Sequence, residues 1–570
     1  MGVAMMATCI SASAQTIASD YKGTSYNNPI SANVFCADPT ALEYNGRLYV
    51  YGTNDHQQFI KNDKKDGNGY GDIKSIVVFS TDDMVNWTFH GTIDVDKVCS
   101  SSWRIAASWA PSVAWRHQRL THKDEFFLYF ANSGGSVGVL KAYSPVGPWT
   151  SPLDGPMITG STPGVSPCTW CFDPGVVIDE NGKGWITFGG GDPNSKGTVL
   201  QPNNAGFAKL KGSMIELDGS AVKIPAPYHL EASELNIIDG KFVYTYCSSW
   251  ATRDADAWNT YKTQQGISLS APAVCTMCYM VSDNPTNPNS WVYKGVCGPH
   301  PGMPSPNNHS HLQKFQGDYY YFYHWGPIMK KMKDAGVIDS SCDGYRSICV
   351  NKATVDEETQ KITPISQNLG GVTAIKNLNP YEQQQAETMA SCGGVDYEDF
   401  ANIKNNTNIN TLGNDASENM QVRMKAGSWI NQRSVDFGTT GAAKFTLRAK
   451  GTGTMQIRLG SRTAQAAATI EFSSTEMEER TVELDASKFV GVKNLYFVVT
   501  AADNVYVDAW QFTEADPSGI QEVESSKKVM RQSYDLSGRS LSDANKRRGV
   551  IIEQYTDESG VKHSSKRLSR

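Results

Sequence analysis

Three acidic residues, Asp38, Asp173 and Glu231, stand at the same place in three similar segments of the chain, each directly before an apolar alternating run. Carboxyl groups that converge on one site repel one another, and this repulsion raises the pKa of at least one of them, as acid–base chemistry requires. Trp, Phe and His residues stand near these acids in the sequence, and side chains of these types suit the binding of a sugar ring. The alternative interpretations are a calcium cage and a set of turn residues at strand starts.

The elements that must position these acids are repeated hairpins. Five segments share a polar start, an alternating run, a turn and an aromatic-rich second strand, at intervals of 59 to 77 residues; they begin at Asp38, Ala110, Asp173, Ala232 and His309. Four of them carry turn residues that tolerate positive φ, at Asn45-Gly46, Asn181-Gly182, Asp239-Gly240 and Gly317-Asp318. The period predicts an all-β, five-bladed β-propeller over residues 28–365, with a β-sandwich as the alternative. The first strands of propeller blades line a central channel, so the acids are expected to meet there.

Bulk properties narrow the class of protein. A length of 570 residues predicts two or three domains, and 13 Trp and 25 Tyr suit an all-β protein with flat rings for a ligand. The net charge of −6 gives no indication of nucleic-acid binding. Apolar runs of 18 residues are missing from the sequence, so we expect no membrane span.

At these acids the sequence resembles glycoside hydrolase family 43, from about Asn28 to Thr354. The resemblance rests on eight short motifs in order, which begin at Ala37, Ser108, Ser144, Phe172, Leu230, Ser282, Asn307 and Tyr345. It implies that Asp38 is the general base, Glu231 the general acid and Asp173 the residue that orients the acid and raises its pKa. Single-displacement hydrolysis with inversion is the implied mechanism.

The resemblance also implies a substrate class and further site residues. We expect an exo-acting α-L-arabinofuranosidase on arabinoxylan of the plant cell wall; β-xylosidase is the main alternative, and an endo-arabinanase or a non-catalytic sugar-binding propeller are less favoured. Candidate substrate contacts are Trp109, Phe172, His309 and Arg346. The competing interpretations are core packing for the two aromatic residues, a hydrogen-bonded channel histidine for His309 and a blade-closing salt bridge for Arg346.

A second region, residues 378–514, reads as short alternating strands and resembles a family 6 carbohydrate-binding module. The resemblance implies Glu387 and Asp508 as calcium ligands, although Gln385 replaces a glutamate of the family pattern. It implies Trp429 as a stacking platform and Asn504 as a sugar contact. We expect no organic cofactor, calcium in this module, and calcium as an option in the propeller channel; a purely structural module is the alternative.

The two ends of the chain indicate export. Residues 1–14 are interpreted as a signal peptide with an Ala12-Ser13-Ala14 cleavage site. After a linker at 515–528, residues 529–570 resemble a Bacteroidetes-type sorting tail, and 11 Lys or Arg against 5 Asp or Glu from Ser526 onward mark it as a separate basic module. We expect a secreted or cell-surface bacterial monomer; a small basic tail without a sorting role is the alternative.

The twelve cysteines are too few for a disulfide scaffold in a chain of this length. Two Cys-x-x-Cys pairs, at Cys168 and at Cys275, lie more than a hundred residues apart, unlike the compact spacing of a zinc ribbon. The expectation is local disulfides or buried thiols, with zinc as the less favoured option.

Overall fold

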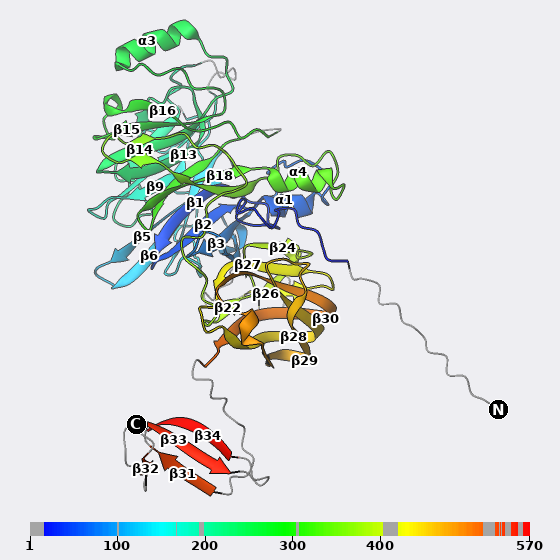
Figure 1. Cartoon of the computed structure of the whole chain (residues 1–570). Helices are drawn as coiled ribbons and strands as arrows, with labels where there is room; N and C mark the ends of the chain where they lie inside the picture. Colours follow the sequence, from blue (N-terminus) through cyan, green and yellow to red (C-terminus); the bar gives the residue numbers. More distant parts are fainter. Residues whose placement is uncertain are drawn as a thin grey trace, which may run out of the picture.

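The chain folds as two β domains and a small C-terminal sheet in a computed structural model (Figure 1). The structure describes residues 16–99, 102–166, 168–192, 199–303, 307–402, 420–516, 530–534, 536, 539–541, 549–556 and 562–569. The predicted signal peptide therefore lies outside the described residues. The all-β class is confirmed, since strands dominate and the helices are few and short.

The first domain consists of consecutive antiparallel sheets, each formed by neighbouring stretches of the chain. The strands of the first two sheets are β1 Ala37–Tyr44, β2 Arg47–Thr53, β3 Ser75–Thr81, β4 Trp87–Asp94, β5 Trp109–Gln118, β6 Lys123–Asn132, β7 Ser136–Ala142 and β8 Ile158–Thr159. The next two sheets contain β9 Gly175–Ile178, β10 Gly184–Phe188, β11 Ala205–Lys209, β12 Val222–Ile224, β13 His229–Ile238, β14 Lys241–Ser248, β15 Met277–Ser282 and β16 Val292–Gly298. The domain ends with β17 Ser310–Phe315, β18 Asp318–Trp325, β19 Ser347–Ala353 and the pair β20 Val355–Asp356 and β21 Lys361–Ile362.

The first strands of these sheets lie next to one another around the domain axis. β1 contacts β5, β5 contacts β9, β9 contacts β13, β13 contacts β17, and β17 contacts β1. A residue with a left-handed backbone lies at or near the start of four of these strands, namely Asp38, Ala110, Asp173 and Ala232, at φ values of 48°, 42°, 45° and 64°. A similar backbone turn thus recurs near the starts of four of the five inner strands. This arrangement is that of a β-propeller.

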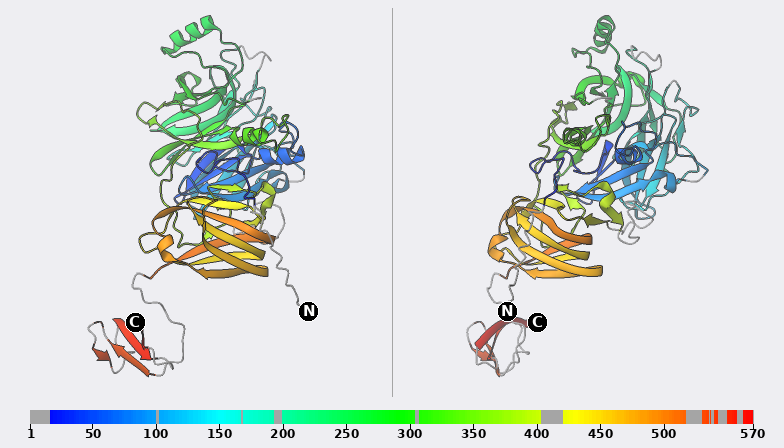
Figure 2. Two further views of the ribbon diagram at one scale, coloured as in Figure 1. Left: turned by 45° about the vertical axis from the view of Figure 1, so that its right-hand side comes forward. Right: turned by 90° about the vertical axis from the view of Figure 1, so that its right-hand side faces the viewer.

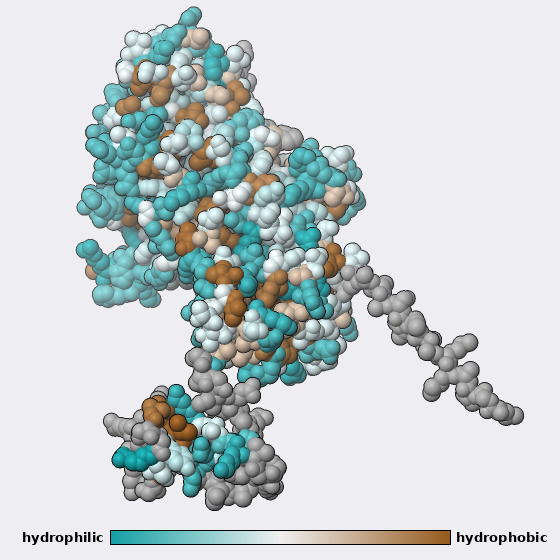
Figure 3. Space-filling view, viewed as in Figure 1, coloured by the Kyte–Doolittle hydropathy of each residue, from teal (hydrophilic) through white to brown (hydrophobic). Residues whose placement is uncertain are grey.

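Among the described residues, four short helices lie in the loops between the strands of this domain. They are α1 Asp55–Lys61, α2 Val95–Val98, α3 Ala255–Gln265 and α4 Pro327–Asp334, with a 3₁₀ turn at Pro288–Ser290. Two further 3₁₀ turns, Tyr397–Asp399 and Ala486–Lys488, lie in the second domain. α1 and α4 pack together through Phe59, Ile328 and Met329, while α3 projects at the far end from the second domain (Figures 1 and 2). Hydrophobic side chains on the face shown in Figure 3 form separate patches on a largely hydrophilic surface, because most large aromatic residues are buried in the sheets.

The second domain is a β-sandwich, as the sequence predicts. Its strands are β22 Gln384–Gln385, β23 Thr388–Met389, β24 Ser391–Gly393, β25 Phe400–Asn402, β26 Met420–Met424, β27 Trp429–Asp436, β28 Ala442–Leu459, β29 Ala466–Glu483 and β30 Val492–Glu514. β28 pairs with both β29 and β30 along most of its length. The C-terminal sheet contains β31 Met530–Tyr534, β32 Ser540–Leu541, β33 Gly549–Thr556 and β34 Lys562–Ser569.

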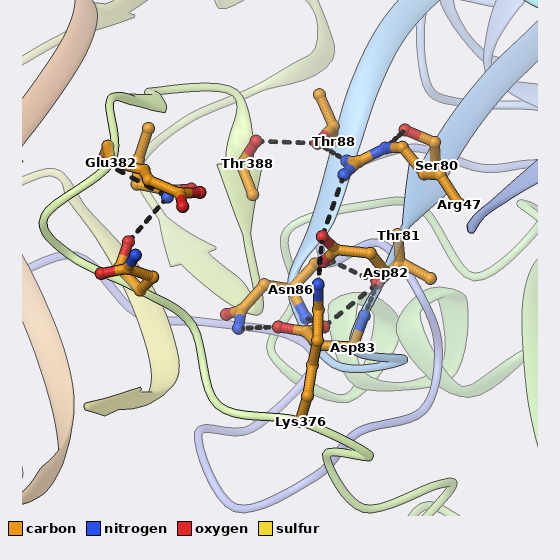
Figure 4. Close-up of polar contacts among 12 residues, drawn as sticks. Arg47, Ser80, Thr81, Asp82, Asp83, Asn86, Thr88, Lys376, Glu382 and Thr388 are labelled. Atoms are coloured by element: carbon orange, nitrogen blue, oxygen red, sulfur yellow. Dashed lines mark hydrogen bonds and ion pairs between the residues drawn. The ribbon is translucent and has the colours of Figure 1, made fainter. Parts of the chain in front are cut away.

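The two large domains share a sheet and a core. β23 of the second domain pairs with β4 of the first, with Thr88 opposite Thr388, and makes a fifth strand in that sheet. One apolar cluster runs from Phe79 and Phe322 of the propeller to Phe445 of the sandwich. Polar contacts also cross the junction. The hydroxyls of Thr88 and Thr388 lie 2.8 Å apart, and the Lys376 ammonium lies 2.7 Å from Asp82 (Figure 4). The Asn86 side-chain amide donates to the Arg433 carbonyl at 2.9 Å.

The segment from Thr16 to Asn28 lies across the junction and ties its two sides together. The Trp429 indole N–H donates to the Ala18 carbonyl at 2.8 Å, and Arg462 pairs with Asp20 at 2.8 Å. Lys22 is 1% exposed, and its ammonium donates to the Ala390 carbonyl at 2.7 Å. Burial, together with the nearby Arg433 charge, lowers the pKa of Lys22 to about 7.

Replacing Lys22 with methionine is expected to stabilise the protein by about 1–4 kcal/mol at neutral pH, because a buried cation that lacks a carboxylate partner among the described residues is removed. Between pH 7 and about 10 the unfolded lysine binds a proton that the folded one has released, so wild-type stability rises with pH in this window. Urea unfolding at pH 7 and pH 9 measures both effects. A Lys22→Met variant that is less stable than wild type at pH 7 contradicts the prediction.

Candidate active site

The three predicted acids meet in one pocket of the propeller. Its volume is about 450 Å³, and it is lined by Asp38, Tyr70, Trp109, Ser133, Gly134, Trp170, Phe172, Asp173, Glu231, Asn307, Asn308, His309 and Arg346. The volume lies in the range of small-ligand sites. Gly175 lies two residues after Asp173. A Cβ atom at this position would lie 2.6 Å from the Glu234 Cα. The chain segments that carry Asp173 and Glu231 therefore approach each other more closely than a residue larger than glycine permits.

Asp38 is held as an anion at the start of β1. One carboxylate oxygen accepts from the Arg346 guanidinium at 2.8 Å, and the other accepts from the Thr53 hydroxyl at 2.7 Å. Burial alone raises the pKa of this carboxyl, but the Arg346 charge, together with the contact from His324 Nδ1 at 3.3 Å, outweighs burial and holds the pKa well below its usual range. Asp38 is therefore ionised at neutral and mildly acidic pH.

The pKa of Glu231 is shifted in the opposite direction to that of Asp38. It lies near the start of β13, and burial, followed by the negative charge of Asp38, raises its pKa to about 7, with Arg346 opposing the rise. Glu231 is consequently protonated at acidic to neutral pH, while Asp38 in the same pocket is ionised. A protonated carboxyl and an ionised carboxylate in one pocket form the pair that general acid–base catalysis needs.

Asp173 lies just before β9 and connects it to the start of β13. Its carboxylate accepts from the Ala232 backbone N–H at 2.8 Å, directly beside Glu231. Burial and the adjacent Glu231 raise the pKa of Asp173 well above its usual range. The negative charges of Asp173 and Glu231 repel each other, and Asp38 contributes a further negative charge that raises the pKa of Glu231.

Arg346 is anchored by an aspartate that sequence reasoning missed. Asp55, the first residue of α1, is fully buried and accepts from the Arg346 Nε at 2.9 Å and from Nη2 at 2.8 Å. The same guanidinium reaches Asp38 and, at 2.9 Å, the Asn307 side chain. Such a two-pronged pair fixes the plane of the guanidinium. Asp55 lies outside the repeated motif, so the repeat did not point to it.

The remaining predicted propeller residues also lie at the pocket. The His309 Nδ1 is 3.9 Å from an Asp38 oxygen, the Trp109 indole N–H donates to the Tyr70 carbonyl at 3.0 Å, and Phe172 is 7% exposed. Trp170, which the sequence analysis did not single out, is 39% exposed and meets Phe172 edge-on at a centroid separation of 5.3 Å. Trp170 lies between Cys168 and Cys171 in the sequence. This pair was interpreted only as zinc ligands or thiols, although the Trp beside it could have indicated a site residue.

A second buried group lies on the inner strands β13 and β17. The Glu234 carboxylate is fully buried, with His311 Nδ1 at 3.3 Å. Among the residues that the structure describes, neither Glu234 oxygen has a hydrogen-bond partner of good geometry. Burial raises the pKa of Glu234. Buried polar atoms of this kind are normally satisfied by water or an ion.

In the sandwich, the structure separates the predicted residues. Trp429 is completely buried under the N-terminal segment, so its ring presents no face to a sugar, and the platform role predicted for it does not fit its position. Asn504 is exposed on β30 with a left-handed backbone at φ 53°. Glu387 and Asp508 are buried close together, and burial raises the pKa of both.

The fold and the acid pair are those of a glycoside hydrolase with an appended β-sandwich domain. Residues 26–358 match glycosyl hydrolases family 43, and residues 385–514 match carbohydrate binding module family 6. The chain belongs to glycosyl hydrolase family 43 and carries a C-terminal family 6 carbohydrate-binding module.

Two relatives, both arabinoxylan arabinofuranohydrolases, are similar to this chain over most of its length. An arabinoxylan arabinofuranohydrolase of Paenibacillus polymyxa is 35% identical, over 85% of this chain and 74% of that protein. Another from Bacillus subtilis is 34% identical, over 90% of this chain and 97% of the relative. The crystal structure of a Bacillus subtilis family 43 arabinoxylan arabinofuranohydrolase, in complex with cellotetraose, superposes with a TM-score of 0.73 at 33% identity, over 88% of this chain and 99% of that one.

Proposed function

We propose that this glycoside hydrolase is an inverting, exo-acting α-L-arabinofuranosidase that removes arabinose from arabinoxylan. The observation that carries the proposal is the divided protonation of the pocket, with Asp38 ionised against Arg346 and Glu231 protonated with a pKa of about 7. Relatives 34–35% identical over most of the chain are arabinoxylan arabinofuranohydrolases, which favours arabinose over xylose as the sugar released.

Each acid has one task in the proposed reaction. Asp38 takes a proton from a water molecule that attacks the anomeric carbon, and Glu231 gives its proton to the departing glycosidic oxygen. Inversion requires the two carboxyls to stand roughly 6.5–9.5 Å apart, so that water fits between the base and the sugar. Arg346 keeps Asp38 ionised and in place, while Asp173 holds the Ala232 N–H beside the acid.

Release of nitrophenol from α-L-arabinofuranoside and β-D-xyloside substrates, alongside release of arabinose from arabinoxylan, tests the specificity. We expect the arabinofuranoside to be hydrolysed faster and the product followed by NMR to have inverted configuration. Preference for the xyloside identifies a β-xylosidase, and internal cleavage of arabinan an endo-arabinanase. A retained configuration contradicts the single-displacement mechanism.

The pH dependence of kcat/KM follows from Glu231. Above its pKa of about 7 the carboxyl loses the proton that it must donate, so kcat/KM is expected to fall about tenfold per pH unit on the alkaline side. The low pKa of Asp38 leaves activity high well below pH 6. Initial rates from pH 4 to 9 at subsaturating substrate measure this profile, and a constant rate up to pH 9 contradicts it.

Calcium in the sandwich is a further part of the proposal. The oxygens Glu387 Oε2 and Asp508 Oδ1 are buried and have no hydrogen-bond partner within the described part of the chain, which fits a hard cation. The other Asp508 oxygen accepts from Arg448 at 2.6 Å, so acidic donors are few and amide or main-chain oxygens must complete the set. A chelator is expected to lower the Tm by several degrees and calcium to restore it; a Glu387→Gln variant should lose this response. An equal response in both proteins contradicts calcium binding at Glu387.

The five-bladed form, the domain limits and export belong to the same proposal. The ring of contacts among β1, β5, β9, β13 and β17 supports five blades at residues 28–365. The N-terminal residues 1–14 and the basic sheet within 529–570 are proposed as signal peptide and sorting tail of a secreted or surface protein. Within the described residues, no helix is long and apolar enough to cross a membrane.

A further inference from the structure

Two buried thiols lie behind the acid strand. Cys247 is on β14, directly opposite Glu231 of β13 in the strand pairing. Cys275 lies in the turn that leads into β15. Both residues are 0% exposed, and their sulfur atoms are 3.9 Å apart.

The backbone holds these two residues in a fixed relation. The Cys275 N–H donates to the Ser248 carbonyl at 3.0 Å, and the Ser248 N–H donates to the Thr276 carbonyl at 2.9 Å. Cys275 itself has a left-handed backbone, with φ at 52°, which turns the chain sharply at this point. To form a disulfide, the sulfur atoms must move from 3.9 Å to about 2.05 Å apart, a shift that rotation of the two cysteine side chains can supply.

We propose that Cys247 and Cys275 form a disulfide bond when the chain folds in an oxidising compartment, an inference that rests on the export proposed above. Both S–H bonds break and one S–S bond forms. The two protons and two electrons pass to a disulfide-containing oxidant, which is reduced to two thiols. Exchange requires an accessible thiolate, so the bond forms before the turn closes, and burial afterwards shields it from reductants.

The bond encloses residues 248–274, the loop that carries α3, and restricts this loop in the unfolded chain. The bond also helps to fix the position of Asn308, which lines the pocket. The Asn308 side-chain amide donates to the Cys275 carbonyl at 2.9 Å, and the Asn308 main chain hydrogen-bonds Glu231. The cross-link is therefore a stabilising element behind the acid rather than a participant in the reaction.

Refolding of the full chain tests the pairing. The protein is refolded either with a mixture of oxidised and reduced glutathione or with a phosphine reductant, and remaining thiols are alkylated in denaturant. We expect two fewer alkylated cysteines after oxidative refolding and a cross-link between the tryptic peptides 242–253 and 263–294. Reduction is expected to lower the Tm by about 5 °C.

Variants assign the bond to its residues. Peptide 263–294 also contains Cys278, so Cys278→Ala is the matched control and should keep the cross-link, while Cys247→Ala and Cys275→Ala should each lose it. Alkylation of both cysteines after oxidative refolding, or a cross-link to a different cysteine, overturns the proposal. Wild-type peptide mapping decides the matter even where a variant folds poorly. Because the oxidant is added in vitro, this result is independent of export, and arabinose release by the reduced protein tests the proposed activity separately.

Discussion

Replacing Glu231 with glutamine is expected to lower kcat/KM on arabinoxylan by about 10²–10⁴-fold, the usual contribution of a positioned acid. The amide has nearly the shape of the carboxylic acid, which keeps the packing of β13, but it cannot transfer a proton to the leaving oxygen. A leaving group that departs as a stable anion needs little protonation. On a dinitrophenyl arabinofuranoside we therefore expect the loss to shrink to about tenfold.

The comparison of the two substrates makes this prediction specific. Initial rates on arabinoxylan and on the activated arabinofuranoside give the two ratios of kcat/KM. Glu216→Gln, a change at an exposed turn outside the pocket, is the matched control and should behave as wild type. Full activity of Glu231→Gln on arabinoxylan, or an equal loss on both substrates, shows that another group donates the proton.

Asp38→Asn is expected to cause a loss of similar size, about 10²–10⁴-fold, but for a different reason. Asparagine cannot accept the proton of the attacking water, and this step is needed whatever the leaving group. The loss should therefore be equally large on arabinoxylan and on the activated substrate. Rates on both substrates, measured beside those of Glu231→Gln, separate the base from the acid.

Stability provides the control for Asp38→Asn. Arg346 keeps its two contacts with Asp55, so removal of the Asp38 charge leaves the buried guanidinium paired. The unfolding midpoint of the variant is expected within a few degrees of wild type, and the lost activity then reflects chemistry rather than unfolding. A strong rescue by the activated leaving group would assign acid rather than base catalysis to Asp38.

The sequence predicted the acids because their signal is local and repeated. Asp38, Asp173 and Glu231 each stand at the start of an alternating run, and in the structure a left-handed residue lies at Asp38, at Asp173 and directly after Glu231. Repetition at one blade position places distant residues side by side without knowledge of any contact. The sandwich was predictable for the same reason, since short alternating strands are visible in the chain.

Contacts between distant segments had no such signal. Asp55 and Arg346 are 291 positions apart, and their pairing depends on how α1 lies against the start of β19. Trp429 was predicted as a sugar platform, yet the N-terminal segment covers it, a contact between residues 411 positions apart. Sequence types identify an aromatic ring or a charge but do not show which part of the chain will cover it.

The three carboxylates therefore follow from the sequence by itself: their identity, their shared position and the expectation that they converge. The tertiary structure alone decided how their protons are divided. Arg346 and Thr53 reach Asp38 and hold it ionised, while burial beside that charge keeps Glu231 protonated. The difference arises because a pKa depends on solvent exclusion and on charges within a few ångströms, and both are set by the packing of segments that are far apart in the chain.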